Sequence, residues 1–265
     1  MYKYIITSGL LCLCLTTASA QILNVDRELT EDSSRNKFDL VGGLFVSSDK
    51  QKRNVIDLSS RIEGDLFFKN KYMLLGLFQN DAVFSGRQTI QNEGMVHVRY
   101  RDMDTRKISP EYFIQYQWNG AWGMEYRNIA GVNMRLKLFD ISGLDLYTGH
   151  GLFGEQERWN WKGVKPENLP ANQSKQTRSM FRFNNYIKLS ARISENADLS
   201  TISYWQFPME GRFFQPRWFL ESNLTIKAGE HFSFLIHWDH IRDKNRLVPI
   251  ESFYYSVSTG IQFNY

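Results

Sequence analysis

The 265-residue chain has few of the residues on which covalent or metal chemistry depends. Its only two cysteines, Cys12 and Cys14, lie near the N-terminus, so the rest of the chain has no thiol for a disulfide, a metal thiolate or a nucleophile. Neither cysteine sits in the pattern of a lipid-modified residue. The net charge of +4 is small and dispersed, which excludes nucleic acid as the expected partner. No glycine-rich nucleotide loop or acidic calcium loop appears, so no cofactor is expected.

Long apolar runs are also missing after the first twenty residues. Those residues run from Lys3 through an apolar stretch at 5–15 to a small-residue cleavage site at 18–20, which is the layout of an export signal. A spanning helix needs about 20 apolar residues, more than this stretch provides. The sequence therefore predicts three regions: a signal peptide at 1–20 that is cleaved, a periplasmic N-terminal segment at 21–37, and one β domain at 38–265.

Aromatic residues are abundant, at 15% of the chain, although the mean hydropathy of −0.42 is polar. The segment 252–265 alternates, with one face almost wholly polar and the other apolar and ending in the aromatic Tyr265. Because successive side chains of a strand point to opposite faces, this segment predicts a strand between lipid and a wet interior. A mature chain without an apolar helix can cross a membrane only as a closed barrel.

Similar alternation recurs along the chain, and we predict an all-β fold, an antiparallel transmembrane β-barrel of about 12 strands in the cell outer membrane. An antiparallel sandwich with one wet face is the structural alternative. The predicted strands cover 38–47, 54–67, 72–84, 93–102, 111–119, 122–139, 144–153, 178–192, 198–206, 217–227, 231–241 and 252–265.

Charged residues fall on the face opposite the apolar one, which is the lumen face of the predicted barrel. Charges of mixed sign in a narrow interior are expected to pair into a network that fills it. Strands two and eight contribute Asp57, Arg61, Glu63, Arg182 and Lys188. The main predicted lumen network consists of His97, Arg99, Arg101, Glu111, Glu125, Arg127, Arg135 and Lys137.

Connection lengths predict an orientation, because outer-membrane barrels have short periplasmic turns and longer outer loops. The connections around 47–54, 85–92, 154–177, 207–216 and 242–251 are assigned to the outside. The longest of them, 154–177, carries Trp159 and Trp161. These tryptophans suggest either a surface contact for a ligand or aromatic packing on a hairpin that projects beyond the membrane.

Several strand motifs resemble a known family. They include Gly94–Tyr100, Glu111–Gln117, Arg127–Arg135, Leu146–Glu155 and, further on, Asn184–Leu189 with Ser203–Pro208. Together they resemble the salt-induced outer-membrane protein family, domain of unknown function 481, in its Bacteroidetes-like form. The resemblance covers most of 38–265 and implies an outer-membrane barrel without an established active site. Phe207 stands where the family pattern leads one to expect proline.

We therefore expect a barrel with a structural, permeability or envelope-stress role and no catalytic activity. One alternative is an outer-membrane lipid hydrolase that uses His237 and Asp239, which share the lumen face. The other is a surface binding protein that acts through loop 154–177. The expected partners are outer-membrane lipid and lipopolysaccharide, together with the barrel-assembly machinery through the C-terminal strand. No pattern predicts an oligomeric state.

Overall fold

A computed structural model describes residues 37–48, 54–68, 71–85, 88–103, 107–211, 213–229 and 232–263. It forms one antiparallel sheet of twelve strands, so the predicted all-β fold and strand number are confirmed. The predicted signal peptide and the predicted segment 21–37 lie outside the described residues, except Lys37, which begins β1. The strands are β1 Lys37–Ser48, β2 Asn54–Phe68, β3 Tyr72–Ser85, β4 Gln88–Asp102, β5 Ile108–Asn119, β6 Met124–Ile141, β7 Leu144–Trp159, β8 Gln176–Ser194, β9 Ala197–Pro208, β10 Arg217–Lys227, β11 Phe232–Arg242 and β12 Phe253–Phe263.

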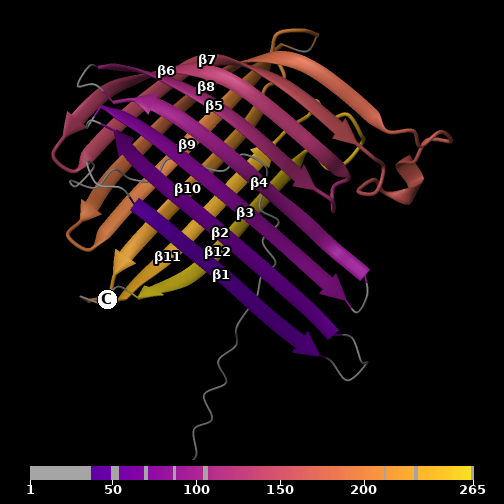
Figure 1. The fold of residues 1–265 in the computed structure, drawn as a ribbon, viewed down its shortest axis with the longest axis horizontal. Coiled ribbons are helices and arrows are strands. Elements are labelled where there is room, and N and C mark those ends of the chain that lie inside the picture. Colours follow the sequence, from indigo (N-terminus) through magenta and orange to yellow (C-terminus); the bar gives the residue numbers. More distant parts are fainter. Residues whose placement is uncertain are drawn as a thin grey trace, which may run out of the picture.

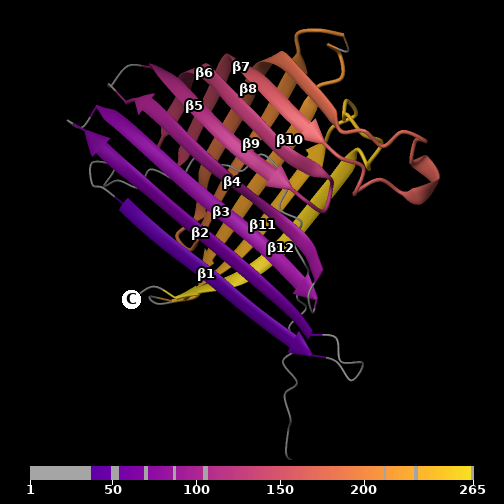
Figure 2. The ribbon, with the colours of Figure 1, turned by 45° about the vertical axis from the view of Figure 1, so that its right-hand side comes forward.

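Each strand pairs with the next along the chain, from β1 with β2 to β11 with β12. The sheet curls into a barrel, and two views bring the end of β12 back beside β1 (Figure 1, Figure 2). The described part of the chain contains no helix that is long and apolar enough to cross a membrane. Its one helical element is a single 3₁₀ turn, Pro166–Asn168.

The two ends of the barrel differ. One end, called here the turn end, carries the connections at 69–71, 103–107, 142–143, 195–196 and 228–231. The other, called here the loop end, carries those at 49–53, 86–87, 120–123, 160–175, 209–216 and 243–252. The predicted connection at 85–92 is wrong, because β4 already starts at Gln88 and leaves only a short turn. The predicted loop 154–177 is also shorter, because β7 and β8 stay paired as far as Trp159 and Gln176.

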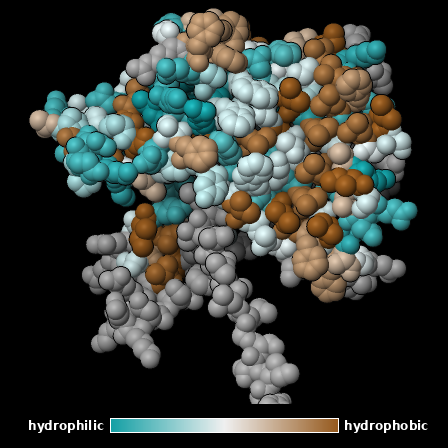
Figure 3. Space-filling model, turned by 180° about the vertical axis from the view of Figure 1, so that it is seen from behind, coloured by the Kyte–Doolittle hydropathy of each residue, from teal (hydrophilic) through white to brown (hydrophobic). Residues whose placement is uncertain are grey.

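Apolar side chains lie mainly on the outside of the wall. Ile114 is 59% exposed, Phe181 is 62% exposed and Tyr255 is 69% exposed. In Figure 3 apolar side chains spread over the wall, whereas hydrophilic ones gather at the loop end, on the left of that view. The predicted alternation also holds on the inside, where Arg99, Arg101 and other charged side chains of the strands are buried. The barrel is thus apolar outside and charged inside.

The interior contains apolar side chains as well. Met73, Leu75, Leu77 and Met95 form one buried cluster on β3 and β4. A larger cluster extends from the middle of the barrel to the loop end and includes Trp122, Trp159, Tyr186, Tyr204 and Phe219. Side chains therefore fill much of the interior between β3 and β11.

Candidate functional site

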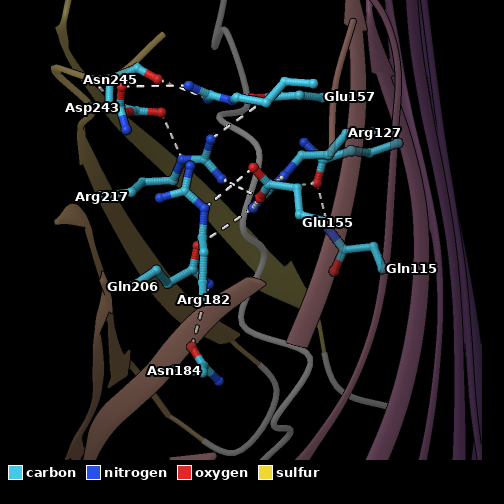
Figure 4. A network of polar contacts seen from close by, with 12 residues as sticks. Gln115, Arg127, Glu155, Glu157, Arg182, Asn184, Gln206, Arg217, Asp243 and Asn245 are labelled. Atoms are coloured by element: carbon cyan, nitrogen blue, oxygen red, sulfur yellow. Dashed lines mark hydrogen bonds and ion pairs between the residues drawn. The ribbon is translucent and has the colours of Figure 1, made fainter. Parts of the chain in front are cut away.

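Glu155 on β7 is the centre of a buried charge network. Its Oε2 atom lies 2.5 Å from Arg127 Nη2 on β6 and 2.9 Å from Arg217 Nη1 on β10. Its Oε1 atom lies 3.2 Å from Arg182 Nε on β8. All four side chains are at most 2% exposed. Because β6 and β10 are separated by three other strands, one carboxylate connects opposite parts of the barrel wall (Figure 4).

The network continues toward the loop end through Arg217. Its Nε donates to Asp243 Oδ2 at 2.7 Å, and its Nη2 lies 3.7 Å from Glu157 Oε2. Arg178 pairs with the same Glu157 and donates from Nη2 to the backbone oxygen of Asn245 at 2.8 Å. Asp243 and Asn245 belong to the β11–β12 connection, so these arginines hold that loop against the barrel interior.

Asp243 remains ionised in this position. Burial alone would raise the pKa of its carboxyl, but the positive charges of Arg217, Arg182 and Arg246 lower that pKa to about 2. An aspartate in an unfolded chain titrates near about 3.9. A depressed pKa contributes stability that is complete above the unfolded value and is lost as the pH falls through the folded value. The Arg217–Asp243 pair therefore stays formed at any pH above about 4.

The loop 243–252 crosses the loop end of the barrel, and we call it the latch. Its Val248 is 2% exposed and packs in the same cluster as Trp122, which lies in the β5–β6 turn. The ring of Tyr254, at the start of β12, lies 4.1 Å from that of Trp122, and the Arg246 guanidinium stacks 4.6 Å above the Trp122 ring. The latch thus spans from β11 and β12 to the far side of the mouth.

An ion pair between two loops extends this closure. Lys165, in the β7–β8 loop, donates to Glu251 of the latch at 2.7 Å. The hydrogen bond from Lys165 lowers the pKa of Glu251, and the bond to Glu251 raises that of Lys165. Both side chains are largely exposed, so this pair orients the loops without adding much stability.

The charges of the network do not balance. The four arginines Arg127, Arg178, Arg182 and Arg217 face the three carboxylates Glu155, Glu157 and Asp243, which leaves one positive charge in excess. Both Nη atoms of Arg182 are buried without a hydrogen-bond acceptor among the described residues. The interior near the loop end is therefore electropositive.

A second cluster lies deeper in the barrel around Glu111 of β5. Its Oε1 accepts from Arg101 Nε at 2.7 Å and lies 3.8 Å from Arg135 Nη1. Its Oε2 accepts from the hydroxyl of Tyr186 on β8 at 2.9 Å. This hydrogen bond runs across the lumen, because β5 and β8 are three strands apart. Side chains thus cross the interior at two heights along the barrel, once around Glu155 and once around Glu111.

Comparison with known proteins gives little beyond the fold. No family model matches the chain, and no curated protein matches it. Among solved structures, one similar chain is the NanC porin in a rhombohedral crystal form. It is 13% identical, with a TM-score of 0.45, and the match covers 85% of this chain and 99% of that chain. A likeness at this level carries no argument about function, so the function has to be inferred from the site itself.

The structure buries six of the eight residues predicted for the lumen network. Arg127 belongs to the Glu155 cluster, and Arg101, Glu111 and Arg135 form the second cluster. His97 and Arg99 are also buried, and His97 Nδ1 lies 3.0 Å from Gln115 Oε1. Within the strands, regular alternation accounts for this outcome.

The structure corrects the prediction for Glu125. Glu125 lies at a bulge near the start of β6 and contacts Lys175 and Arg158 on the outside of the barrel. A bulge inserts an extra residue, so strict alternation fails there. Lys137 lies on the predicted face near the turn end, where it shares the Tyr147 ring with Arg135, pairs with Asp140 and is partly exposed.

Of the two alternatives for the tryptophans, the contacts favour packing on the hairpin. Trp159 is 2% exposed, points inward and donates from its indole nitrogen to Glu157 Oε2 at 3.0 Å. Trp161 is partly buried against the large interior cluster and donates to the backbone oxygen of Ser174 at 2.8 Å. Both residues therefore stabilise the base of the loop.

The candidate hydrolase pair is close in space. His237 Nε2 lies 3.2 Å from Asp239 Oδ1, and His237 Nδ1 lies 2.7 Å from Asn223 Oδ1. Among the described residues, no serine hydroxyl forms a hydrogen bond to His237, and no three His, Cys, Asp or Glu side chains are arranged to hold a metal ion. Ser258 of β12 stands opposite His237 in the strand register, whereas the printed contacts of the His237 ring are to Asp239 and Asn223.

Sequence reasoning missed the residues at the centre of the site. It assigned Glu155 and Glu157 to a loop, although Phe153, Glu155, Glu157 and Trp159 continue the inward alternation of β7. That alternation was a signal for a longer strand. No comparable alternation pointed to Arg217 and Asp243, because Arg217 is the first residue of β10 and Asp243 follows the last residue of β11.

Proposed function

We propose that this protein is an outer-membrane β-barrel with a permeability role, whose lumen is held closed by the latch and the Glu155 network. The observation that carries this proposal is the bridge across the loop end, formed by the Trp122–Tyr254 contact and by Arg217, which pairs with Asp243 of the latch and with Glu155 of β7. A twelve-stranded barrel is wider than the small eight-stranded barrels that side chains fill completely. Release of the latch would therefore open a path for solutes.

The placement in a membrane rests on the distribution of polarity. Soluble proteins rarely expose large contiguous apolar surfaces, and they do not line their interior with arginines and carboxylates. Here exposed apolar residues recur along the outer faces of β2 to β12, while Arg127, Arg182 and Glu155 are fully buried. The predicted export signal and the twelve antiparallel strands support the outer membrane as the location.

The first test replaces neighbouring residues of β5. Ile114→Arg places a charge on the apolar outer face and should lower the free energy of unfolding by about 2 to 4 kcal/mol near the middle of a bilayer. Gln115→Arg places the same charge on the inner face and should have a much smaller effect. Urea unfolding of the protein in lipid vesicles, followed by tryptophan fluorescence, measures both. Equal losses of stability would contradict the membrane placement.

The second test addresses the latch. The wild-type protein in a planar lipid bilayer should be closed for most of the time. Asp243→Asn removes the charge that Arg217 binds, and Tyr254→Ala removes the contact with Trp122. Each variant should produce more frequent or larger conductance steps. Because arginines outnumber carboxylates in the network, the opened state should favour anions in a salt gradient.

The matched control is Glu167→Gln in the β7–β8 loop, where an exposed carboxylate makes no ion pair among the described residues. It removes the same charge outside the network and should leave the conductance unchanged. If both latch variants showed as little conductance as the wild type across salts and voltages, the proposed permeability role would be wrong. A structural role would then remain.

The remaining expectations fit the same proposal. Contact with lipopolysaccharide and assembly through the C-terminal strand follow from an outer-membrane location. Membership of the salt-induced outer-membrane protein family rests on the strand motifs alone. We do not propose the lipid hydrolase, because His237 contacts Asp239 and Asn223 and forms no hydrogen bond to a serine hydroxyl among the described residues.

A further inference from the structure

Two hollows lie next to each other on the outside of the wall over β4, β5 and β6. The first is an apolar groove of about 510 Å³, lined among others by Tyr100, Tyr112, Ile114, Ala130 and Val132. The second is a mixed pocket of about 580 Å³ closer to the loop end, lined among others by Asn92, Tyr116, Trp118, Glu125, Asn160 and Lys162. Neither hollow takes part in the lumen network.

The two hollows follow one another along β5. Tyr112, Ile114, Tyr116 and Trp118 are alternate residues, so their side chains stand in one row on the outer face. The groove exists because Ala130 faces Ile114 from β6 and Gly154 follows Ala130 on β7. The next row toward the loop end is polar on both neighbouring strands, with Asn128 opposite Tyr116 and Gln156 opposite Asn128. The apolar surface therefore ends where the mixed pocket begins.

The pocket combines aromatic rings with held polar groups. The rings of Tyr116 and Trp118 are 5.7 Å apart, and the Trp118 indole nitrogen donates to Asn92 Oδ1 at 3.0 Å. Asn160 donates from Nδ2 to Glu125 Oε1 at 3.2 Å, which fixes both side chains at the pocket wall. Exposed rings beside amide and carboxylate groups suit a sugar, which has apolar ring faces and hydroxyls at its edge.

The charge around the pocket is positive. Lys175 lies 2.7 Å and Arg158 lies 3.3 Å from the Glu125 carboxylate. Lys162 lines the pocket, is exposed and forms no ion pair with the residues that the structure describes. Two cations thus contact the one carboxylate and a third lines the pocket, which favours an anionic group such as a phosphate near Lys162.

We propose that these hollows form a lateral binding site for an acylated, phosphorylated glycolipid of the outer leaflet. An acyl chain lies in the groove, a sugar rests against Tyr116 and Trp118, and a phosphate pairs with Lys162. The inference rests on the proposed membrane location, because the loop end must face the outer leaflet. It is independent of the latch, since no latch residue lines either hollow.

Native mass spectrometry of the detergent-purified protein tests the site. A diphosphorylated, acylated disaccharide lipid should stay bound, and a zwitterionic phospholipid of equal chain length should not. Lys162→Ala removes the phosphate partner, and Ala130→Leu fills the groove. Each should weaken binding of the glycolipid by about tenfold.

Matched controls separate this site from general lipid contact. Lys244→Ala removes an exposed lysine of the latch, and Thr259→Leu places the same leucine side chain on the outer face of β12. Both should bind the glycolipid like the wild type. Equal losses in site and control variants, equal retention of the zwitterionic lipid, or unchanged binding in both site variants would each overturn the proposal. Heat-modifiable gel mobility shows whether every variant is still a folded barrel, so a failed membrane assignment is distinguished from a failed site.

Discussion

Replacement of Glu155 by glutamine is expected to lower the free energy of unfolding by about 3 to 5 kcal/mol, because it leaves buried arginines without their shared counter-charge. Arg127, Arg182 and Arg217 all pair with this carboxylate, and none of the three is more than 2% exposed. Charges in a dry interior cannot recover this loss by hydration. Urea unfolding in lipid vesicles gives the difference, and the temperature at which gel mobility changes gives an independent measure.

Glu125→Gln is the matched control for this prediction. Glu125 also contacts two cations, Arg158 and Lys175, but it lies on the outside with 24% of its side chain exposed. Its loss should cost no more than about 1 kcal/mol. If the two substitutions reduced stability equally, the Glu155 network would not be the dry, shared site described above.

Alanine in place of Gly149 should also destabilise the barrel strongly. A Cβ atom at this position of β7 would lie 2.0 Å from the ring of Tyr186 on β8. That ring cannot move aside freely, since it is 1% exposed, packs 5.3 Å from the ring of Tyr204 and binds Glu111 through its hydroxyl. Overpacking of this kind costs about 1 to 3 kcal/mol, and displacement of Tyr186 would add the loss of a buried hydrogen bond.

Gly154→Ala on the same strand provides the comparison. Its Cβ would meet only the Phe181 ring at 3.4 Å, an ordinary contact on the outer face. We expect nearly unchanged unfolding for this variant and earlier unfolding for Gly149→Ala. Tyr186→Phe should reproduce the hydrogen-bond part of the Gly149 effect, because it keeps the ring and removes the hydroxyl. A Gly149→Ala protein as stable as Gly154→Ala would show that Tyr186 is not held in place.

The fold was predictable because a barrel strand needs only local alternation. The residues of β5 illustrate this, since Tyr112, Ile114 and Tyr116 are exposed while Glu111 and Gln117 are buried. The same reasoning failed for Glu125, where a bulge at the start of β6 interrupts the period of two. The predicted end of β7 is too early, because charged residues such as Glu155 and Glu157 favour a loop when the sequence is considered alone. In the structure arginines of β8 balance both charges, and the strand continues.

The candidate site was less predictable for a different reason. Arg217 of β10 meets Glu155 of β7 only after the sheet has curled, and nothing in the local sequence of either residue sets that geometry. Trp122 and Tyr254 likewise become neighbours through the path of a whole loop. Periodicity indicates which face a residue occupies, whereas contacts across the lumen depend on strand order, stagger and loop path.

The contact between Trp122 and Tyr254 joins residues about half the chain length apart, which has a consequence for biogenesis. Tyr254 and the latch can reach their positions only after β11 and β12 have joined the sheet. The latch therefore closes the mouth at the end of folding. By then strand pairing has already offset the entropic cost of bringing these distant parts of the chain together. Closure of the mouth by the latch thus marks a barrel whose last two strands are already in place.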